Sequence, residues 1–130
     1  MPPKRILMVD DNPKARRIVA DFLEDEAYEI HTTGDPEEAL LWAAELLPDL
    51  VILDVVMPGM DGLEFARELR AYPVTRRIPF MFLSVQRLEL KLEEARELGA
   101  AAYLDKPVKR ETLVAVVRKL LREKGTAPEE

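Results

Sequence analysis

The chain has 130 residues, of which 48% are hydrophobic and 34% are charged, and it contains no cysteine. This length and composition are typical of one globular domain with a packed core, and the lack of cysteine excludes disulfides and thiolate chemistry. The formal net charge of −6 repels polyanions, so we expect no direct binding of nucleic acid. The first apolar run, Ile6 to Val9, is too short for a signal peptide or a membrane span, so we expect a cytoplasmic protein with no membrane partner.

Short apolar runs alternate five times with longer segments of helical periodicity. This rhythm predicts an α/β fold, a doubly wound five-stranded parallel sheet with helices on both faces. The third run, Leu50 to Leu53, is the most continuously apolar and predicts a central strand. We expect residues 1–125 to form the domain and Thr126–Glu130 to be a disordered tail. The expected strands are Arg5–Val9, Tyr28–Thr32, Leu50–Leu53, Phe80–Leu83 and Ala101–Leu104.

The first two helices have clear start signals. Asn12-Pro13 and Asp35-Pro36 each place a capping side chain before a proline at the first helical position. Glu38 predicts a capping box with Asp35. Apolar residues at helical spacing predict the core-facing positions of the first, second and last helices. These positions are Ile18, Val19, Phe22 and Leu23, then Leu40, Ala43 and Leu47, and finally Leu113, Val116, Val117, Leu120 and Leu121.

The third helix is expected over Gly62–Ala71 and the fourth over Arg87–Leu98, with Gly99 as the C-cap of the fourth. Leucines near the start of the fourth segment alternate as they would in a strand. A run rich in Glu, Leu, Lys and Arg without Gly or Pro nevertheless favours a helix, on which Leu90 would be exposed.

Acidic residues directly follow two of the expected strands. Asp10 and Asp11 come after the first strand, and Asp54 comes after the third. Because ligands of a doubly wound sheet bind at the carboxyl ends of its strands, neighbouring first and third strands would bring these carboxylates together. Two carboxylates about 5 Å apart repel by about 3 kcal/mol at an effective dielectric of about 20, so the cluster requires a cation or a raised pKa. Oxygen ligands alone select a hard ion, and the pattern predicts Mg²⁺.

Two more polar residues lie at the ends of the remaining strands. Ser84 closes the fourth apolar run, and Lys106 follows the fifth. The hydroxyl can donate a hydrogen bond to a phosphoryl oxygen, and the ammonium can neutralise charge shared by a carboxylate nucleophile and an incoming phosphoryl group. The strand ends therefore predict phosphoryl transfer onto a carboxylate.

Five segments, in this order, resemble the receiver domains of bacterial two-component response regulators over the range from Arg5 to about Arg122. Each segment is weak alone, but their joint order is specific. The resemblance implies a flavodoxin-like fold with strand order 2-1-3-4-5, a role in signal transduction or a phosphorelay, and a cis peptide bond before Pro107. The segments are Val9-Asp10-Asp11-Asn12, Asp49-Leu50-Val51-Ile52-Leu53-Asp54, Met57-Pro58-Gly59-Met60-Asp61-Gly62, Leu83-Ser84 and Gly99-Ala100-Ala101-Ala102-Tyr103-Leu104-Asp105-Lys106-Pro107.

The resemblance also implies the roles of the site residues. Asp54 would accept a phosphoryl group from a histidine kinase or a phosphotransfer protein. Asp10, Asp11, Asp54 and the backbone carbonyl of Val56 would hold Mg²⁺, and Lys106 would contact the phosphoryl group. A domain of this kind is not a turnover enzyme, although it can remove its own phosphoryl group.

Ser84 and Tyr103 would transmit the phosphorylated state. Ser84 would contact the phosphoryl group, and Tyr103 resembles the family's switch aromatic, although it could also be an ordinary strand residue. Their movement would alter the face formed by the fourth helix, fifth strand and fifth helix. A downstream protein or effector domain would read that face, or a second copy of the chain would bind it in a phosphorylation-dependent homodimer.

Two positions depart from the family pattern. Val85 stands where the family usually has a smaller residue and would restrict access to Asp54, while the side chain of Val56 cannot hydrogen-bond an attacking water. Both features predict a long-lived phosphoaspartate. His31 has no partner at metal-binding spacing, and we expect it and Trp42 to be structural.

Two other functions use similar residues. A phosphatase of the haloacid dehalogenase type has an aspartate nucleophile and Mg²⁺, but its first strand should end in Asp-x-Asp, a pattern that Asp10-Asp11-Asn12 lacks. A receiver-like adaptor that is never phosphorylated would usually lose an acid or the lysine, and this chain retains both. The sequence is compatible with a stand-alone receiver and with part of a longer regulator, and it leaves the kinase and the output partner open.

Overall fold

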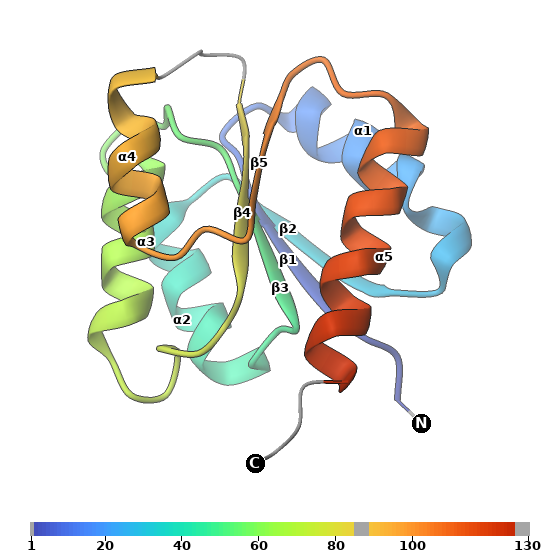
Figure 1. Ribbon diagram of the computed structural model, residues 1–130, viewed down its shortest axis with the longest axis horizontal. Coiled ribbons are helices and arrows are strands. Elements are labelled where there is room, and N and C mark those ends of the chain that lie inside the picture. Colours follow the sequence, from blue (N-terminus) through green and yellow to red (C-terminus); the bar gives the residue numbers. More distant parts are fainter. Residues whose placement is uncertain (1, 85–88, 127–130) are drawn as a thin grey trace.

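The structure of the protein, a computed structural model, describes residues 2–84 and 89–126, with only the backbone course described for 89–91 and 123–126. The chain alternates strands and helices throughout (Figure 1). The strands are β1 Arg5–Val9, β2 Glu29–Thr33, β3 Leu50–Leu53, β4 Phe80–Ser84 and β5 Ala102–Asp105. The helices are α1 Pro13–Phe22, the 3₁₀ helix η1 Glu24–Glu26, α2 Pro36–Leu46, α3 Gly62–Ala71, α4 Glu89–Glu97 and α5 Arg110–Thr126.

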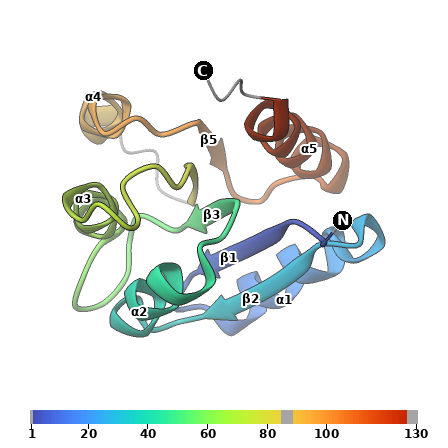
Figure 2. The same ribbon diagram turned by 90° about the horizontal axis from the view of Figure 1, so that it is seen from below.

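The five strands form one parallel sheet in the order β2-β1-β3-β4-β5. Helices α2, α3 and α4 cover one face, and α1 and α5 cover the other (Figures 1 and 2). The predicted fold class is therefore confirmed. Strands β2 and β5 differ from their expected bounds by one residue at each end, and β4 ends one residue later than expected, at Ser84.

The side chains of each central strand alternate between two cores. Residues of one parity pack with α2, α3 and α4, and those of the other parity pack with α1 and α5. This follows from the two-residue period of a strand, and it explains why the central strands are continuously apolar. The α2–α4 core includes Leu7, Val9, Val51, Leu53, Phe80 and Phe82, and the α1–α5 core includes Ile6, Met8, Leu50, Ile52, Met81 and Leu83.

The caps of the helices agree with the sequence in all but one detail. The Asn12 side chain accepts hydrogen bonds from the backbone N–H groups of Lys14 and Ala15, and the Asp35 side chain accepts one from Glu37. The predicted capping box at Glu38 was wrong. The hydroxyl of Thr33 accepts a hydrogen bond from the Asp35 N–H at 3.1 Å and donates one to Glu38 at 2.6 Å, and so takes the place of a direct bond.

The third helix has a capping box that the sequence reasoning did not identify. The Asp61 side chain accepts a hydrogen bond from the Glu64 N–H at 2.9 Å, and the Glu64 side chain accepts one from the Asp61 N–H at 3.0 Å. At the other end of the next helix, Gly99 has a φ of 87° and its N–H bonds the carbonyl of Arg96 at 3.0 Å, as expected of a helix C-cap.

Two residues expected in the core are exposed. Ile18 is 48% exposed because Val19 in α1 and Leu23, the residue after the helix, cover the sheet instead. Leu47 is 52% exposed because α2 ends at Leu46 and Leu47 adopts a left-handed conformation with a φ of 49°, which takes it off the helical stripe. The other expected core positions are buried or partly buried.

Several remaining predictions fall at the limits of the described chain. Helix α5 continues to Thr126, the first residue of the expected tail, while 127–130 lie outside the described residues. Val85 and the side chain of Leu90 also lie outside them. Over the described part of the chain, every helix is too short or too polar to cross a membrane.

Candidate metal and phosphoryl site

Three acidic residues converge at the carboxyl ends of β1 and β3. These strands are adjacent with Val9 opposite Leu53, and the backbone N–H of Asp54 donates to the carbonyl of Val9 at 3.0 Å. One carboxylate oxygen from each of Asp10, Asp11 and Asp54 lies within 4.8 Å of the other two. Asp10 is fully buried and Asp54 is 7% exposed, whereas Asp11 is exposed. The structure thus brings together the three acids that the sequence predicted as ligands.

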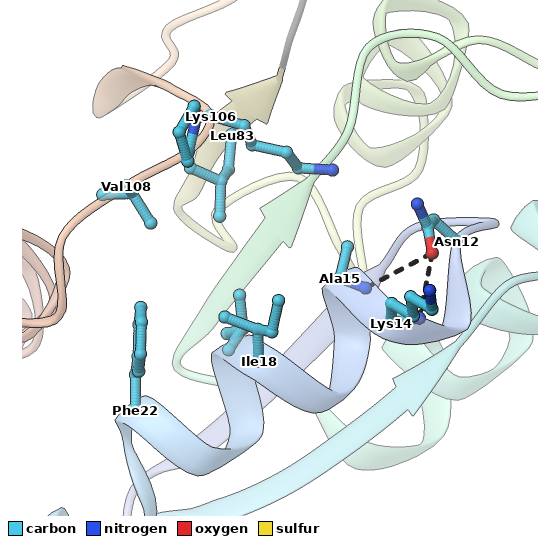
Figure 3. Close-up of a pocket in the computed structure, with 10 residues that line it drawn as sticks. Asn12, Lys14, Ala15, Ile18, Phe22, Leu83, Lys106 and Val108 are labelled. Atoms are coloured by element: carbon cyan, nitrogen blue, oxygen red, sulfur yellow. Dashed lines mark hydrogen bonds between the residues drawn. The ribbon is translucent and has the colours of Figure 1, made fainter.

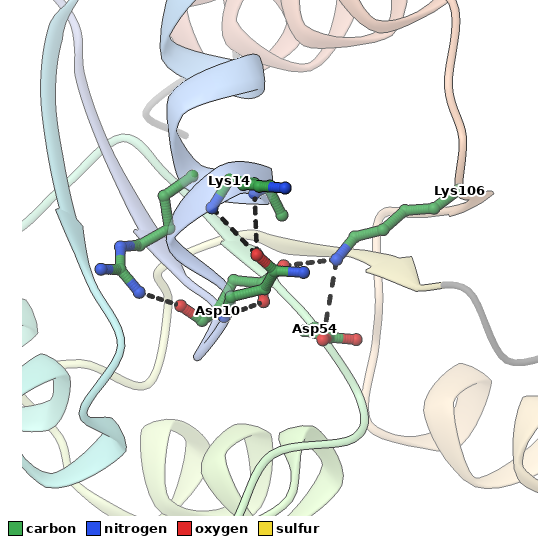
Figure 4. Close-up of polar contacts among 7 residues, drawn as sticks. Asp10, Lys14, Asp54 and Lys106 are labelled. Carbon is green, nitrogen blue, oxygen red and sulfur yellow. Dashed lines mark hydrogen bonds and ion pairs between the residues drawn. The ribbon is translucent and has the colours of Figure 1, made fainter.

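Lys106 and Ser84 join the acids from the neighbouring strand ends. The Lys106 ammonium donates a short hydrogen bond to Asp10 Oδ2 and lies 3.7 Å from Asp54 Oδ2 (Figure 4). Its backbone N–H bonds the carbonyl of Ser84 at 2.9 Å, and the following bond to Pro107 is cis, as expected. Ser84 is fully buried. Four strand ends therefore contribute to one compact site.

Burial raises the pKa of Asp54 above its ordinary value, and the negative charge of Asp10 raises that pKa further. Lys106 and hydrogen bonds from the Ser84 side chain and the Val56 backbone oppose this rise without cancelling it. The folded protein thus holds a carboxylate in a place that does not favour its charge. A bound cation would favour the ionised form and lower the pKa.

The donor atoms fit a hard divalent cation. The site offers oxygen ligands only, and Asp54 Oδ1 is buried with no hydrogen-bond partner in the described part of the chain. Unsatisfied buried polar atoms are rare in folded proteins, so this oxygen is a suitable ligand atom for a cation. Mg²⁺ typically binds through a few carboxylates with water or phosphate oxygens completing its shell, which agrees with this cluster.

Tyr103 and Val56 are the two remaining residues for which the sequence predicted a role. The Tyr103 ring packs against Phe82 with ring centroids 5.7 Å apart, and its hydroxyl oxygen is buried. Val56 is 50% exposed, so its side chain faces solvent beside Asp54. Elsewhere, His31 Nε2 lies 2.8 Å from a carboxylate oxygen of Glu29, and its ring packs edge-on against the Trp42 ring with centroids 6.3 Å apart. These contacts agree with the structural roles expected for both residues.

An apolar hollow of about 390 Å³ adjoins the site between α1 and the segment that follows β5 (Figure 3). Ile18, Phe22 and Val108 line it, and Lys106 forms part of the wall nearest to the acids. The exposure of Ile18, which contradicts its expected burial, is explained by its position in this hollow.

Two residues that contact the acid segment were missed by the sequence reasoning. The Arg16 guanidinium donates a hydrogen bond of 2.6 Å to the backbone carbonyl of Asp10, and Gly34 lies close to the same carbonyl. Arg16 had a detectable signal, because helical side chains lean toward the helix N-terminus and Asn12-Pro13 places that terminus next to Asp10. Gly34 had none, since its proximity arises only when β2 pairs with β1.

The family model of the response regulator receiver domain matches residues 6–118, and the chain belongs to this family. It is 41% identical over 118 residues to the response regulator PleD of Caulobacter vibrioides, an alignment that covers 91% of this chain and 26% of PleD. It is 37% identical over 127 residues to the DNA-binding response regulator MtrA of Mycolicibacterium smegmatis, which covers 98% of this chain and 54% of MtrA. The chain therefore spans between a quarter and about half of the length of these relatives.

Solved structures agree in fold over nearly the whole chain. The chemotaxis response regulator CheY4 of Vibrio cholerae is 33% identical with a TM-score of 0.83, over 91% of this chain and 98% of CheY4. The signal receiver domain of a histidine kinase from Syntrophus aciditrophicus is 31% identical with a TM-score of 0.84, over 98% of this chain and 95% of that one. The flavodoxin-like architecture is shared, and the function is that of a receiver domain.

Proposed function

We propose that Asp54 accepts a phosphoryl group from a histidine kinase or a phosphotransfer protein, in a Mg²⁺ site that also contains Asp10, Asp11 and the Val56 carbonyl. The observation that carries this proposal is the convergence of three carboxylates and one ammonium around a buried, unpartnered oxygen of Asp54. Capping and solvation do not require this arrangement, whereas phosphoryl transfer requires all of its parts.

The reaction would be an in-line displacement at phosphorus. A carboxylate oxygen of Asp54 attacks the phosphohistidine, the new O–P bond forms as the P–N bond breaks, and the electron pair of that bond stays on the imidazole nitrogen. Bound Mg²⁺ would supply positive charge to the phosphoryl oxygens and the nucleophile. Lys106 would then move its ammonium from Asp10 toward the transferred group, since the cation would balance the charge of Asp10.

The phosphoryl group would change the surface through Ser84 and Tyr103. It adds about −1.5 to −2 units of charge at a site where Ser84 can donate a hydrogen bond. The Tyr103 ring, which packs on Phe82, would be held in this inward position when Ser84 moves toward the phosphoryl group. The face of α4, β5 and α5 would then differ between the two states, and a downstream protein, an effector domain or a second copy of the chain would bind one of them.

The apolar hollow is suited to a protein donor. It lies next to Lys106 and is lined by apolar side chains from α1, including the exposed Ile18. A helix that carries the phosphohistidine could pack there and present the phosphoryl group to Asp54. The change Ile18→Glu should then reduce transfer from a phosphorylated protein donor about tenfold, roughly 1.4 kcal/mol, and leave uptake from a small phosphodonor unchanged. Equal effects on both donors would rule out this docking surface.

The receiver site does not specify the output activity that it controls. One relative is named as DNA-binding, and another, RpfG of Xanthomonas campestris, is named a cyclic di-GMP phosphodiesterase response regulator. We assign neither activity to this chain, which acts in the cytoplasm as a phosphorylated relay and not as a turnover enzyme. The phosphatase and unphosphorylated-adaptor alternatives are not favoured, because the chain belongs to the receiver family and retains its acids and lysine.

The test is incubation of the protein with phosphoramidate and Mg²⁺, followed by intact-mass measurement. We expect the mass of one phosphoryl group to be added, and we expect Asp54→Asn or chelation of the metal to abolish it. Asp61→Asn is the matched control, because Asn caps a helix about as well as Asp and Asp61 is outside the site. Uptake that persists in Asp54→Asn, or no uptake by the unmodified chain, would contradict the proposal.

A further inference from the structure

We propose that Arg16 is a positioning residue for Mg²⁺, because it fixes the peptide between Asp10 and Asp11 and thereby directs the Asp11 carboxylate toward the ion. This inference rests on the proposed function of the acidic site. It concerns a cationic side chain that is not itself a ligand.

The Asp10 residue is held at each of its polar groups. Its backbone N–H donates to the carbonyl of Thr33 at 3.1 Å, and its backbone carbonyl accepts the 2.6 Å bond from Arg16. Its carboxylate accepts hydrogen bonds from the Asn12 N–H and from the Lys106 ammonium. Of these four bonds, the one from Arg16 is the bond made to the Asp10 carbonyl, and the other three hold the N–H and the carboxylate of Asp10.

Asp11 has no comparable restraint of its own. It is exposed, and its carboxylate makes no hydrogen bond or ion pair with the described residues. The Asp10 carbonyl and the Asp11 N–H belong to one planar peptide unit, so the bond from Arg16 sets the orientation of the backbone from which the Asp11 side chain projects. The position of Asp11 near Asp10 and Asp54 therefore depends on its backbone.

Gly34 leaves the space that Arg16 occupies. A Cβ atom at this position would lie 2.6 Å from a terminal nitrogen of Arg16 and 3.3 Å from both the Asp10 carbonyl oxygen and the Asp11 Cα. Gly34 does not have a left-handed backbone, so close approach accounts for a glycine here. The turn after β2, Arg16 and the acid segment thus form one packed unit.

Electrostatics alone would not favour a cation at this place. A guanidinium beside an Mg²⁺ site repels the ion, so its charge lowers affinity. The directed hydrogen bond has the opposite effect, because residues that orient metal ligands commonly change metal affinity by about 10-fold to 100-fold. Loss of the Arg16 charge should therefore raise the affinity for Mg²⁺, whereas loss of its hydrogen bond should lower it. Two neutral variants of Arg16 separate these two effects.

The experiment is calorimetric titration of the full chain with Mg²⁺ for Arg16→Gln and Arg16→Met. Both variants lose the charge, but only Gln keeps an N–H donor for the Asp10 carbonyl. We expect Met to bind Mg²⁺ about tenfold more weakly than Gln, with Arg16→Lys close to the unmodified chain. Arg17→Met, on the exposed neighbouring position, is the control and should not change the affinity.

The relative Mg²⁺ affinities of the variants decide whether Arg16 has this role. Equal affinities of the Gln and Met variants would overturn the role of Arg16, and a tenfold difference with unchanged thermal unfolding would support it. If Arg16→Met fails to fold, Gly34→Ala replaces it, because it retains the charge and displaces the guanidinium; unchanged affinity would again overturn the proposal. No Mg²⁺ binding by the unmodified chain would instead refute the proposed metal site, and with it this inference.

Discussion

The interior of β3 and the residue that follows it have opposite effects on stability. Leu50 to Leu53 are apolar and fully buried, and each buried side chain of this size contributes about 1.5–3 kcal/mol. The next residue, Asp54, is a 7% exposed carboxylate close to the buried Asp10. Two carboxylates about 5 Å apart repel by about 3 kcal/mol at an effective dielectric of about 20. We call Asp10, Asp11, Asp54 and Lys106 the charged rim of the sheet. The apolar strand interiors supply the stability that keeps the acids of this rim together despite their repulsion.

The largest effect should come from weakening the strand interior. Ile52→Ala removes a fully buried side chain from the α1–α5 core and should lower the free energy of unfolding by about 2–5 kcal/mol. Ile18→Ala is the matched control, because Ile18 is 48% exposed, and it should change that free energy by about 0.5 kcal/mol or less. Urea unfolding followed by circular dichroism measures both. Similar losses at the two positions would show that the core is not organised as described.

The next largest effect concerns the charge balance of the rim. Lys106→Met removes the ammonium that contacts Asp10 and Asp54, and should slow phosphoryl uptake from phosphoramidate about 100-fold at saturating Mg²⁺. Lys109→Met, at an exposed position outside the site, should leave the rate unchanged. An unchanged rate in Lys106→Met would exclude the lysine from the chemistry.

Removing the charge of Asp54 should stabilise the fold, in contrast to the loss of stability expected for Ile52→Ala, and the change should be smaller. Burial and Asp10 raise the pKa of Asp54 above 3.8, so the folded protein binds its proton more tightly than the unfolded chain does. The ionised carboxylate therefore destabilises the fold above the folded pKa. This penalty shrinks as the pH falls below that pKa and is lost near the unfolded value of 3.8. Asp54→Asn should raise the melting temperature near neutral pH, and the gain should shrink as the pH is lowered toward 3.8.

This measurement requires a chelator, because Mg²⁺ would stabilise only the chain that binds it. Each kcal/mol of stabilisation corresponds to about 3–6 °C for a domain of this size. A lower melting temperature for Asp54→Asn near neutral pH would mean that Lys106 and the hydrogen bonds to Asp54 outweigh its burial and repulsion. The charged rim would then stabilise the fold, as the strand interior does.

The smallest expected effect is on the lifetime of the phosphoaspartate. The Val56 side chain faces solvent beside Asp54 and cannot orient an attacking water, so we expect the phosphoryl group to persist well beyond seconds in Mg²⁺ buffer. Val56→Asn adds one hydrogen bond of about 1 kcal/mol to that water and should shorten the half-life about fivefold. Val74→Asn, at a similarly exposed position away from the site, serves as the control. Loss of the label from the unmodified chain within seconds would refute the prediction.

The sequence predicted the strands and the acidic rim because both depend on local patterns. The length and period of an apolar run predict a strand, and a polar residue directly after it lies at the carboxyl edge of a parallel sheet. Asp10, Asp54 and Lys106 were therefore identified without coordinates. The one-residue differences at β2 and β5 reflect edge strands, which are only partly buried and have weaker apolar signals.

The errors arose where a residue has two possible partners. Thr33 took the bond that Glu38 was expected to make, because a hydroxyl can donate and accept at once and lies at the end of β2. Ile18 fits the helical stripe by spacing, but its side chain lies over the hollow beside Lys106 rather than over the sheet. The contact of Arg16 with Asp10 is different, because it is local: a helical side chain leans toward the helix N-terminus, which Asn12-Pro13 places next to Asp10, and the sequence reasoning overlooked this signal.

The most direct test of the central claim is paramagnetic broadening of backbone amide resonances by Mn²⁺, which accepts the same oxygen ligands as Mg²⁺. One ion held between the ends of β1 and β3 should broaden the amides of Asp10–Asn12 and Asp54–Val56 first. Competing Mg²⁺ or the change Asp54→Asn should suppress that broadening. Broadening that is uniform, or that centres on acidic residues away from these two segments, would contradict the account.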